Sequence, residues 1–431
     1  MGKRKFVAMS ETTDDSGTSG EEDFISLNLG GEDEPKSRQE RRHHERKESK
    51  RKREKDDSEQ DNLVCCPWME LMDSTAPEAP HKRLQKEVEC FLRYMEPTEA
   101  ERQLREYLVH KIRWAVQSRY SEDVEVHVFG SFGSNLYLPN SDIDVVVCTP
   151  PHIQVTLRNL ARVLENAGVC SSPQVIEKAM VPVIKFRDLL TDLPVDIVID
   201  STSGLGSGKV IRQMMKKQPA LRPLTLIIKH FLALHDLNEV FTGGIGGYAT
   251  VCLVMSFLQI HPKLASGRMK AENNLGVLLL DFLQLYGHHF SMDTVGICPK
   301  TASYFQTNGR NLSMRGHRHY FSIRDPDCLS NDLGCKSFNS YHVRSSFNYS
   351  YLVLSRKMFQ MYADWQGKRD RCGVTEEKFK RVNWDASLLG SILTVSMNVM
   401  DQRERIHRVY TDKSWLREEA ASTFKLNQEK C

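Results

Sequence analysis

The stretch VFGSFGSNLYLPNSDIDVVV, residues Val128–Val147, decides the fold. Residues 124–129 alternate apolar and polar side chains, which predicts a strand with one buried face. Gly130 and Ser131 end that strand, and the missing Cβ of a glycine lets backbone N–H groups approach an anion closely. A second strand begins at Ile143. The stretch therefore predicts two strands joined through a turn that is suited to binding phosphate.

Two carboxylates stand at the start of the second strand. Because side chains alternate along a strand, Asp142 and Asp144 share one face. They interrupt an apolar run, where two like charges are costly to bury without a cation. A Gly-Ser turn or an Asp-x-Asp pair alone is more typical of an ordinary surface loop. Together they predict a metal site for Mg²⁺-assisted nucleotidyl transfer.

A third carboxylate is expected from residues 195–200, which read as a further strand. Asp196 and Asp200 lie on the same face of it, and either could complete the metal site. Asp196 has apolar neighbours on both sides, so its burial needs an explanation, whereas Asp200 stands at the strand end. We therefore predict Asp196 as the third metal ligand, beside the acceptor hydroxyl, with Asp200 as the alternative.

Length and composition set further limits. The 431 residues, 40% of them hydrophobic, are enough for two ordered domains and a tail. No apolar run reaches roughly 18 residues, and the N-terminus lacks an apolar signal core, so neither a membrane span nor secretion is expected. The 11 cysteines include no Cys-x-x-Cys pair, which argues against a zinc module and a disulfide framework and fits a reducing compartment.

Charge is segregated along the chain, although its net value is only +3. Residues 1–62 are polar and charged, first acidic and then basic, and we predict that they form a disordered tail. The basic run 41–55 is typical of nuclear import or RNA contact, and a solvated spacer is the alternative.

The ordered chain divides into two predicted domains. Residues 63–205 read as an α+β palm, a mixed sheet with preceding and intervening helices. Residues 206–415 are predicted to be mostly helical, and 416–431 form a C-terminal tail. The expected elements are helices at 81–95, from 99, at 155–167, 221–234, 248–260, 275–286 and 379–400, and strands at 124–129, 143–147, 178–188 and 195–200.

Several further motifs carry a family resemblance: Leu136–Pro139, Ser141–Asp144, Val181–Lys185, Leu237–Gly246 and Asp325-Pro326. With them the chain, from about residue 67 to about residue 410, resembles the DNA-polymerase-β-like nucleotidyltransferases. Within these it is similar to nuclear poly(A) polymerases of the topoisomerase-related-function type, the catalytic subunits of the TRAMP RNA-surveillance complex. The resemblance implies a polymerase-β-like palm followed by a helical central domain. It also implies template-independent addition of AMP from ATP to RNA 3′ ends, with Mg²⁺ or Mn²⁺.

The resemblance also implies roles for individual residues. Gly130 and Ser131 would contact the triphosphate, with Asp142, Asp144 and Asp196 as metal ligands. Lys229 falls where the family places a phosphate-binding lysine, and the cost of burying an ammonium in an apolar helix independently supports an anion partner. A snorkelling surface lysine is the alternative.

The remaining implied contacts are with the base and the sugar. Tyr248, preceded by Gly247, falls where the family stacks a tyrosine on the base, although plain packing is the commoner use of such a residue. Asn331 and Asp332 match the nucleotide-recognition loop, and an asparagine where a uridylyltransferase subgroup has histidine favours ATP over UTP. Ser203-Gly204 stands where the family has the sugar-binding Asn-Gly.

Four departures from the family pattern bear on turnover and nucleotide selectivity. Serine at 203 is shorter than asparagine, so a weaker ribose contact is expected. Gly247 stands where some relatives have a serine that can reach phosphate. The other two are Gly133-Ser134-Asn135 in place of Lys-Thr-Gly, and Gly334-Cys335-Lys336 in place of a Gly-Arg.

Three other functions compete with adenylyl transfer: terminal uridylyl transfer, small-molecule nucleotidyl transfer, and a catalytically weak scaffold. The presence of all three carboxylates argues against the scaffold. No RNA-recognition module is evident in the sequence, so we expect low processivity for the isolated chain and RNA grip from the tail or from partners. The resemblance implies a zinc-knuckle RNA-binding subunit, an RNA helicase and functional association with the exosome. It places the chain in the nucleus or the nucleolus.

Overall fold

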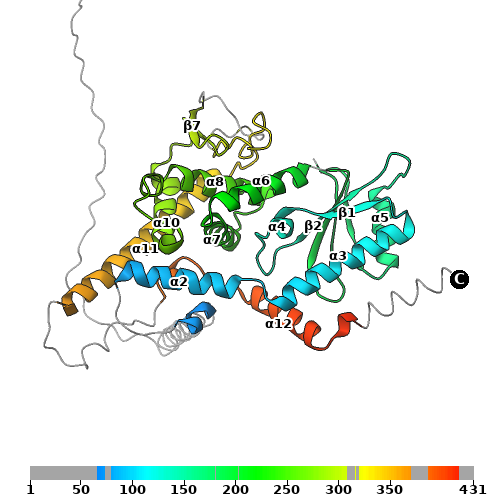
Figure 1. Cartoon of the computed structure of the whole chain (residues 1–431), viewed down its shortest axis with the longest axis horizontal. Coiled ribbons are helices and arrows are strands. Elements are labelled where there is room, and N and C mark those ends of the chain that lie inside the picture. Colours follow the sequence, from blue (N-terminus) through cyan, green and yellow to red (C-terminus); the bar gives the residue numbers. More distant parts are fainter. Residues whose placement is uncertain are drawn as a thin grey trace, which may run out of the picture. The chain divides into compact units, whose positions relative to one another are not determined.

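The computed structural model describes residues 66–72, 79–179, 181–201, 203–307, 316, 320–369 and 387–416 (Figure 1). The predicted tail 1–62 and nearly all of the predicted tail 416–431 lie outside these residues. In the described part of the chain no helix is long and apolar enough to cross a membrane. The buried apolar side chains form two cores, one around a five-stranded sheet and one among helices.

The sheet has the strand order β1-β2-β5-β4-β3. Its central strands β2 and β5 run parallel, and the other neighbouring pairs are antiparallel, so the sheet is mixed. The strands are β1 (Glu125–Val128), β2 (Ile143–Cys148), β3 (Gln174–Ile176), β4 (Val183–Arg187) and β5 (Pro194–Ile199). The predicted α+β class is confirmed, and β3 is an edge strand that the sequence pattern missed because it is only three residues long.

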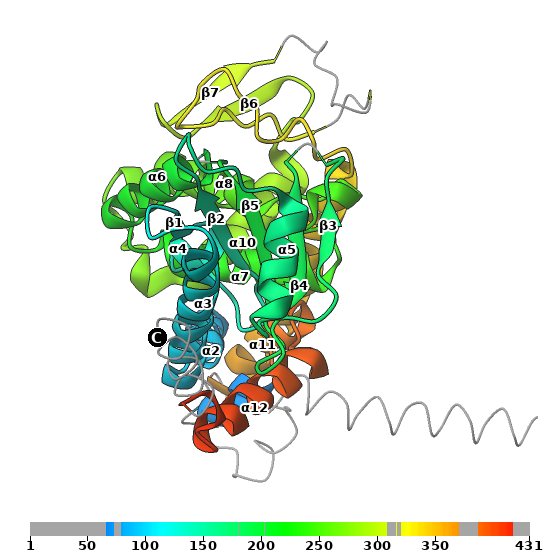
Figure 2. The ribbon, with the colours of Figure 1, turned by 90° about the vertical axis from the view of Figure 1, so that its right-hand side faces the viewer.

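One face of the sheet is covered by α3 (Glu99–Arg119) and α5 (Leu157–Asn166) (Figure 2). Ile143, Val145 and Val147 of β2 are buried in this core. Because side chains alternate, the carboxylate of Asp144 lies on the opposite face. The sheet thus has one face for stability and one for a site.

Local sequence explains where α3 begins. Thr98 is its N-cap and accepts a hydrogen bond from the backbone N–H of Glu101 at 3.2 Å, while the Thr98 N–H donates to the Glu101 carboxylate at 2.7 Å. This reciprocal capping box satisfies two backbone donors that a helix start otherwise leaves unpaired.

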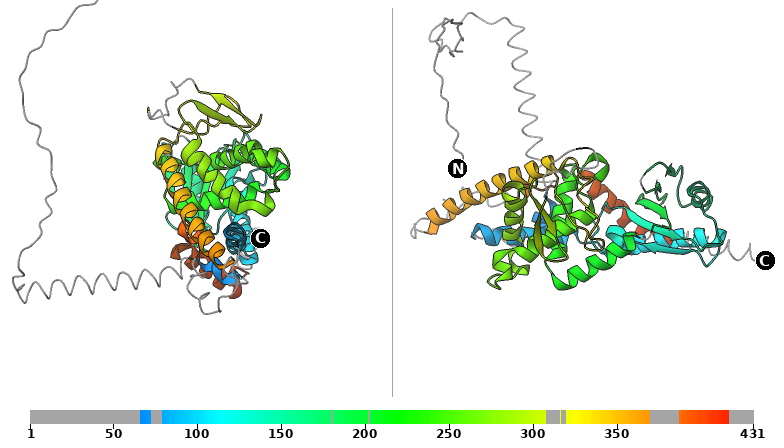
Figure 3. Two further views of the ribbon diagram at one scale, coloured as in Figure 1. Left: turned by 90° about the vertical axis from the view of Figure 1, so that its left-hand side faces the viewer. Right: turned by 90° about the horizontal axis from the view of Figure 1, so that it is seen from above.

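The helical core follows the sheet in sequence. Three of its helices, α7, α8 and α10, are apolar over most of their surface, which suits burial among other helices. α11 packs against α10. Figure 3 shows α11, drawn in yellow to orange, as a long helix. The longer helices are α6 (Ser203–Lys217), α7 (Leu221–Leu234), α8 (Gly247–Ile260), α10 (Leu275–Gln284) and α11 (Ser340–Arg369), with a two-stranded sheet of β6 (Val295–Cys298) and β7 (Ser303–Gln306).

Near each end of the described chain, one helix packs in a different core from the one that its position in the sequence predicts. α2 (Pro80–Met95) buries Leu84 and Phe91 among the helices, although the sequence placed it with the palm. α12 (Met397–Thr411) packs on α3 and buries Ile406 in the palm core, although the sequence placed it with the helical domain. An amphipathic pattern does not identify the surface that a helix covers, so the sequence alone could not assign these two helices to a core.

The remaining elements are short, and one of them replaces a predicted turn. The predicted Gly-Ser turn is instead one turn of helix, α4. Of the predicted helix 379–400, residues 379–386 lie outside the described residues, and helix α12 begins only at Met397. The short elements are η1 (Pro67–Leu71), α4 (Gly130–Gly133), η2 (Val240–Thr242), α9 (Pro262–Ala265), η3 (Glu272–Asn274), η4 (Leu285–His289) and η6 (Leu389–Ser391).

Candidate active site

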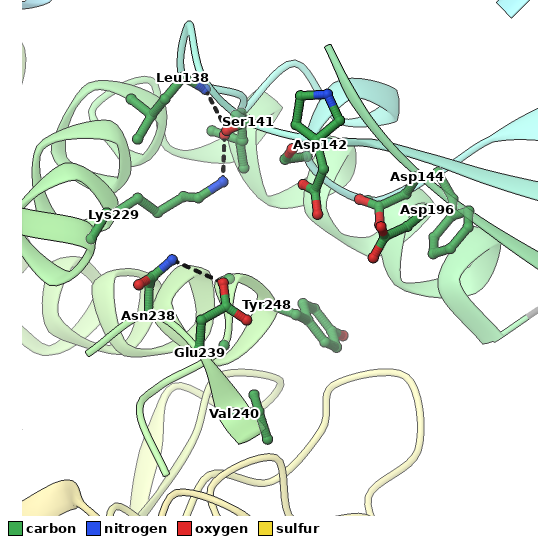
Figure 4. A pocket seen from close by; sticks show the side chains of 18 of the residues that line it. Leu138, Ser141, Asp142, Asp144, Asp196, Lys229, Asn238, Glu239, Val240 and Tyr248 are labelled. Carbon is green, nitrogen blue, oxygen red and sulfur yellow. Dashed lines mark hydrogen bonds between the residues drawn. The ribbon is translucent and has the colours of Figure 1, made fainter. Parts of the chain in front are cut away.

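Strand register brings the predicted carboxylates together. Asp144 on β2 lies directly opposite Asp196 on the parallel strand β5, and Asp142 immediately precedes β2. One carboxylate oxygen from each of the three aspartates lies within 4.8 Å of the others. Figure 4 shows the three side chains grouped on one side of a cavity.

Asp200, the alternative third ligand, is engaged elsewhere. It follows β5 with a φ of 54°, a left-handed conformation that aspartate tolerates. Its carboxylate accepts hydrogen bonds from the backbone N–H and the hydroxyl of Thr149, both at 2.7 Å. The structure therefore gives Asp200 a loop-ordering role and leaves Asp196 beside the other two carboxylates.

The burial and mutual repulsion of the three carboxylates favour a bound cation. Burial, followed by the charges of Asp142 and Asp196, raises the pKa of Asp144 to about 7, against the opposing effects of the Ser131 N–H and Lys229. Burial also raises the pKa of Asp196, against the opposing effect of Lys185. A cluster of three carboxylates in which Asp144 and Asp196 have raised pKa values fits a site for a hard divalent cation, which takes oxygen ligands.

Gly130 allows the chain to pass against this group. Its φ is +61°, and a Cβ at this position would lie 1.8 Å from Oδ2 of Asp144. The next residue, Ser131, directs its backbone N–H to Asp144, and its buried hydroxyl has no hydrogen-bond partner among the described residues. A buried, unpartnered donor beside the carboxylates fits the oxygen of a bound phosphate.

Lys229 enters the cavity from α7 and is half-buried (Figure 4). Its ammonium donates to the backbone oxygen of Leu136 at 2.8 Å. Burial lowers the pKa of Lys229 to about 8, and Asp142 and Asp144 oppose that decrease. The snorkelling alternative is therefore wrong, since the ammonium points inward and lines the cavity.

The start of α8 lines the same cavity. Gly247 is its first residue, and a Cβ there would lie 3.9 Å from Nζ of Lys229. The N-cap is Gly246, which offers no side-chain acceptor for the first N–H groups of the helix. Gly247 and Lys229 thus place backbone donors and an ammonium in the cavity that the carboxylates also line.

Tyr248 and Asn331 are connected through Asp325. The Tyr248 hydroxyl donates to Oδ1 of Asp325 at 3.0 Å, and Nδ2 of Asn331 donates to Oδ2 at 3.0 Å. Burial raises the pKa of Tyr248, so its hydroxyl stays a donor. Tyr248 lines the cavity, whereas Asn331 is not among its lining residues and reaches Tyr248 only through Asp325.

Asp332 does not join the site. Its carboxylate accepts hydrogen bonds from the Ser322 hydroxyl at 2.7 Å and from the backbone N–H groups of Ile323 and Gly334 at 3.0 and 2.9 Å. It is not among the residues that line the cavity. Asp332 therefore orders the loop that presents Asn331.

The sugar-binding pair is described in part. Gly204 lines the cavity near the start of α6, where a Cβ would lie 2.3 Å from the Phe129 ring. The side chain of Ser203 lies outside the described residues.

The cavity has a volume of about 980 Å³ and is lined by all three aspartates. Sequence reasoning missed other lining residues because their position depends on strand register and loop path. Lys185 is opposite Asp196 on β4, and only the alternation of 183–187 hinted at its face. The missed lining residues include Gln174, Lys185, Arg187, Asn238, Glu239 and Phe241.

Two family models match the chain. Residues 84–216 match the model described as poly(A) RNA polymerase, mitochondrial-like, central palm domain. Residues 274–331 match that of the Cid1 family poly A polymerases.

Curated relatives agree with these matches. Poly(A) RNA polymerase cid14 of Schizosaccharomyces pombe is 39% identical over 325 residues, which are 74% of this chain and 46% of the relative. Poly(A) RNA polymerase protein 1 of Saccharomyces cerevisiae is 38% identical, over 64% of this chain and 44% of the relative. The chain therefore spans about half the length of these relatives. The inactive poly(A) RNA polymerase protein Trf4-2 of Drosophila melanogaster is 34% identical, over 63% of this chain and 68% of the relative.

Solved structures agree with these sequence matches. The polymerase core of TRAMP, a RNA surveillance complex, is 31% identical with a TM-score of 0.65, over 76% of this chain and 98% of that one. The Cid1 poly(U) polymerase, at 20% identity and a TM-score of 0.54 over 64% of this chain and 95% of that one, shows the shared fold alone. The chain belongs to the family of Cid1- and Trf4-type poly(A) RNA polymerases.

Proposed function

We propose that this chain adds AMP from ATP to the 3′ ends of RNA without a template. The observation that carries the proposal is the meeting of Asp142, Asp144 and Asp196 with the Gly130-Ser131 turn in one cavity. Membership of a poly(A) RNA polymerase family supports the same substrates. One relative is named inactive, but this chain keeps three clustered carboxylates, which favours an enzyme over a scaffold.

In the proposed reaction the acceptor 3′-oxygen bonds to the α-phosphorus of ATP, and pyrophosphate leaves. Asp142, Asp144 and Asp196 would hold Mg²⁺, or Mn²⁺ in its place. Such ions lower the pKa of the acceptor hydroxyl and neutralise charge on the attacking and leaving oxygens. Ser131 and Lys229 would bind the triphosphate, since the former has an unpartnered buried hydroxyl and the latter a buried ammonium.

Preference for ATP over UTP is proposed from the state of Asn331. Its Nδ2 is used by Asp325, which leaves Oδ1 as an acceptor. The exocyclic amino group of adenine is a donor that matches this acceptor, whereas uracil has a carbonyl oxygen at the corresponding position. Tyr248 would stack on the base, held by its bond to the same aspartate.

We also propose a TRAMP-like assembly that acts on RNA in the nucleus. The polymerase core of TRAMP supports the assembly, and the predicted zinc-knuckle subunit, helicase and exosome link follow from the same resemblance. The nuclear part rests on the basic run 41–55, which lies outside the described residues.

The test is extension of a 5′-labelled single-stranded RNA by the purified chain with Mg²⁺ and each nucleoside triphosphate separately. ATP alone should give extension, and Asp142→Ala/Asp144→Ala should abolish it. Extension mainly with UTP would contradict the Asn331 argument while keeping the chemistry. No extension, even after addition of a zinc-knuckle partner, would favour the scaffold.

A further inference from the structure

A row of directly opposed residues on neighbouring strands continues past the carboxylates and includes a cationic side chain. In strand register Asp144 lies opposite Asp196, Asp196 opposite Lys185, and Lys185 opposite Gln174. Directly opposed residues on neighbouring strands share a face of the sheet. The row therefore runs from the centre of the sheet to its edge strand β3, and all four side chains line the cavity.

Within this row Lys185 forms an ion pair with Oδ2 of Asp196. The lysine side chain is 47% exposed and that of Asp196 is 19% exposed, so the ammonium reaches in from the cavity mouth on a flexible stem. Lys229 is placed differently, since it is half-buried and donates to the backbone oxygen of Leu136 at 2.8 Å. Lys185 is therefore the cation that can leave the carboxylates by rotation of its side chain.

We propose that Lys185 is an exchangeable counter-ion of Asp196, displaced when a divalent cation takes that carboxylate and then free to pair with the 3′-terminal phosphate of the acceptor strand. This inference rests on the proposed function. Lysine is suited to such exchange because its ammonium is a point charge that requires no fixed geometry.

Charge repulsion supplies the coupling. An ammonium and a divalent cation on the same carboxylate oxygen repel each other, so the ammonium must move for the ion to bind. The cavity beside β4 is also lined by Ser172 and Gln174, which offer polar contacts to an anionic strand. An acceptor phosphate on that side would hold the displaced ammonium and favour cation binding at Asp196.

The test is titration of the metal-free full chain with Mn²⁺, with free Mn²⁺ followed by electron paramagnetic resonance. Lys185→Met should bind Mn²⁺ about tenfold more tightly than the unaltered chain, because the competing charge is gone. Lys185→Arg keeps a charge and should resemble the unaltered chain. Arg187→Met is the matched control, since Arg187 lies two residues along the same strand, lines the cavity and pairs with Asp192 at 3.3 Å.

A second arm adds an oligoadenylate with a 3′-deoxy end. The oligoadenylate should tighten Mn²⁺ binding several-fold in the unaltered chain and in Arg187→Met. It should leave the Mn²⁺ affinity of Lys185→Met unchanged. If Lys185→Met binds Mn²⁺ no more tightly than the unaltered chain while Asp144→Asn still weakens binding, this inference is overturned and the proposed function stands. If Asp144→Asn binds Mn²⁺ as the unaltered chain does, the ion is not at the carboxylates, and the proposed function fails as well.

Discussion

Gly130 is the residue at which backbone conformation and site geometry depend most directly on each other. Its φ of +61° alone would tolerate a few residue types, but the Oδ2 of Asp144 occupies the place of a Cβ. The absence of a side chain is therefore what lets the turn and the carboxylates share one cavity.

Gly130→Ala should reduce the rate of RNA extension by at least about a hundredfold, since the methyl group displaces the Asp144 carboxylate. Gly168→Ala is a matched control, with a φ of +68° and nothing within 4 Å of its Cβ. Both variants carry the same backbone strain, about 1 kcal/mol, so the steric contact with Asp144 is what distinguishes them. Equal activity of the two variants would show that Asp144 is not held as described.

Asp144→Asn should stabilise the metal-free protein at pH 8. The pKa of Asp144 is about 7 in the folded chain and 3.8 as its ordinary value, so the unfolded chain loses this proton first as the pH rises. Stability contributed by the proton is complete below pH 4 and is lost as the pH passes 7. The asparagine variant escapes the loss, which is worth at most about 4 kcal/mol. Thermal denaturation from pH 4 to 8 without metal checks this, and parallel curves would contradict it.

At the scale of elements, Asp325 links helix α8 to the loop of residues 320–334. It is buried, and its two oxygens accept from Tyr248 and Asn331. The backbone N–H of Asp327 also donates to Oδ1, at 2.9 Å. One carboxylate thus sets the positions of the proposed base-stacking ring and the proposed base-reading amide.

Asp325→Ala should raise the KM for ATP and lower the ratio of ATP to UTP in kcat/KM by about tenfold, because both base contacts lose their anchor. The affinity for Mn²⁺ should stay unchanged, since Asp325 does not belong to the carboxylate group. Steady-state extension kinetics with each nucleotide measure the ratio. An unaltered ratio with intact folding would remove Asn331 and Tyr248 from nucleotide recognition.

The sequence was informative where a local pattern determines the outcome. The apolar neighbours of Asp196 predicted it rather than Asp200, and the structure places its carboxylate beside those of Asp142 and Asp144, because burial in a strand is a local property. The roles of Lys185 and Asp325 needed the register of distant strands and the path of a loop, which one sequence does not give. Asp332 shows the same limit, since adjacency to Asn331 could not reveal that its oxygens are used within the loop.

At the scale of the whole molecule, the crossing helices join the two cores. Arg403 on α12 donates to both oxygens of Glu101 on α3, at 2.9 and 3.1 Å, and to the backbone oxygens of Tyr94 and Glu96. The Glu101 side chain is 2% exposed and also caps α3. The ion pair thus holds α12 at the junction between α2 and α3.

Arg403→Met should lower the free energy of unfolding by about 3 kcal/mol, because it leaves a buried carboxylate without its partner. Arg408→Met is the control on the same helix, since Arg408 pairs with Glu404 at the surface and its loss should cost under about 1 kcal/mol. Urea denaturation gives both values. Similar values for the two variants would show that the crossing helix does not depend on Arg403.

The central claim, that Asp142, Asp144 and Asp196 together transfer adenylate, is tested most directly by comparing Asp196→Asn with Asp200→Asn. The measurement is the single-turnover rate of AMP addition to a labelled RNA with ATP and Mg²⁺. Asp196→Asn should lose at least about a thousandfold in rate, whereas Asp200→Asn should stay within about tenfold of the unaltered chain, since asparagine tolerates the left-handed backbone. A rate retained by Asp196→Asn, or lost only in Asp200→Asn, would contradict the account.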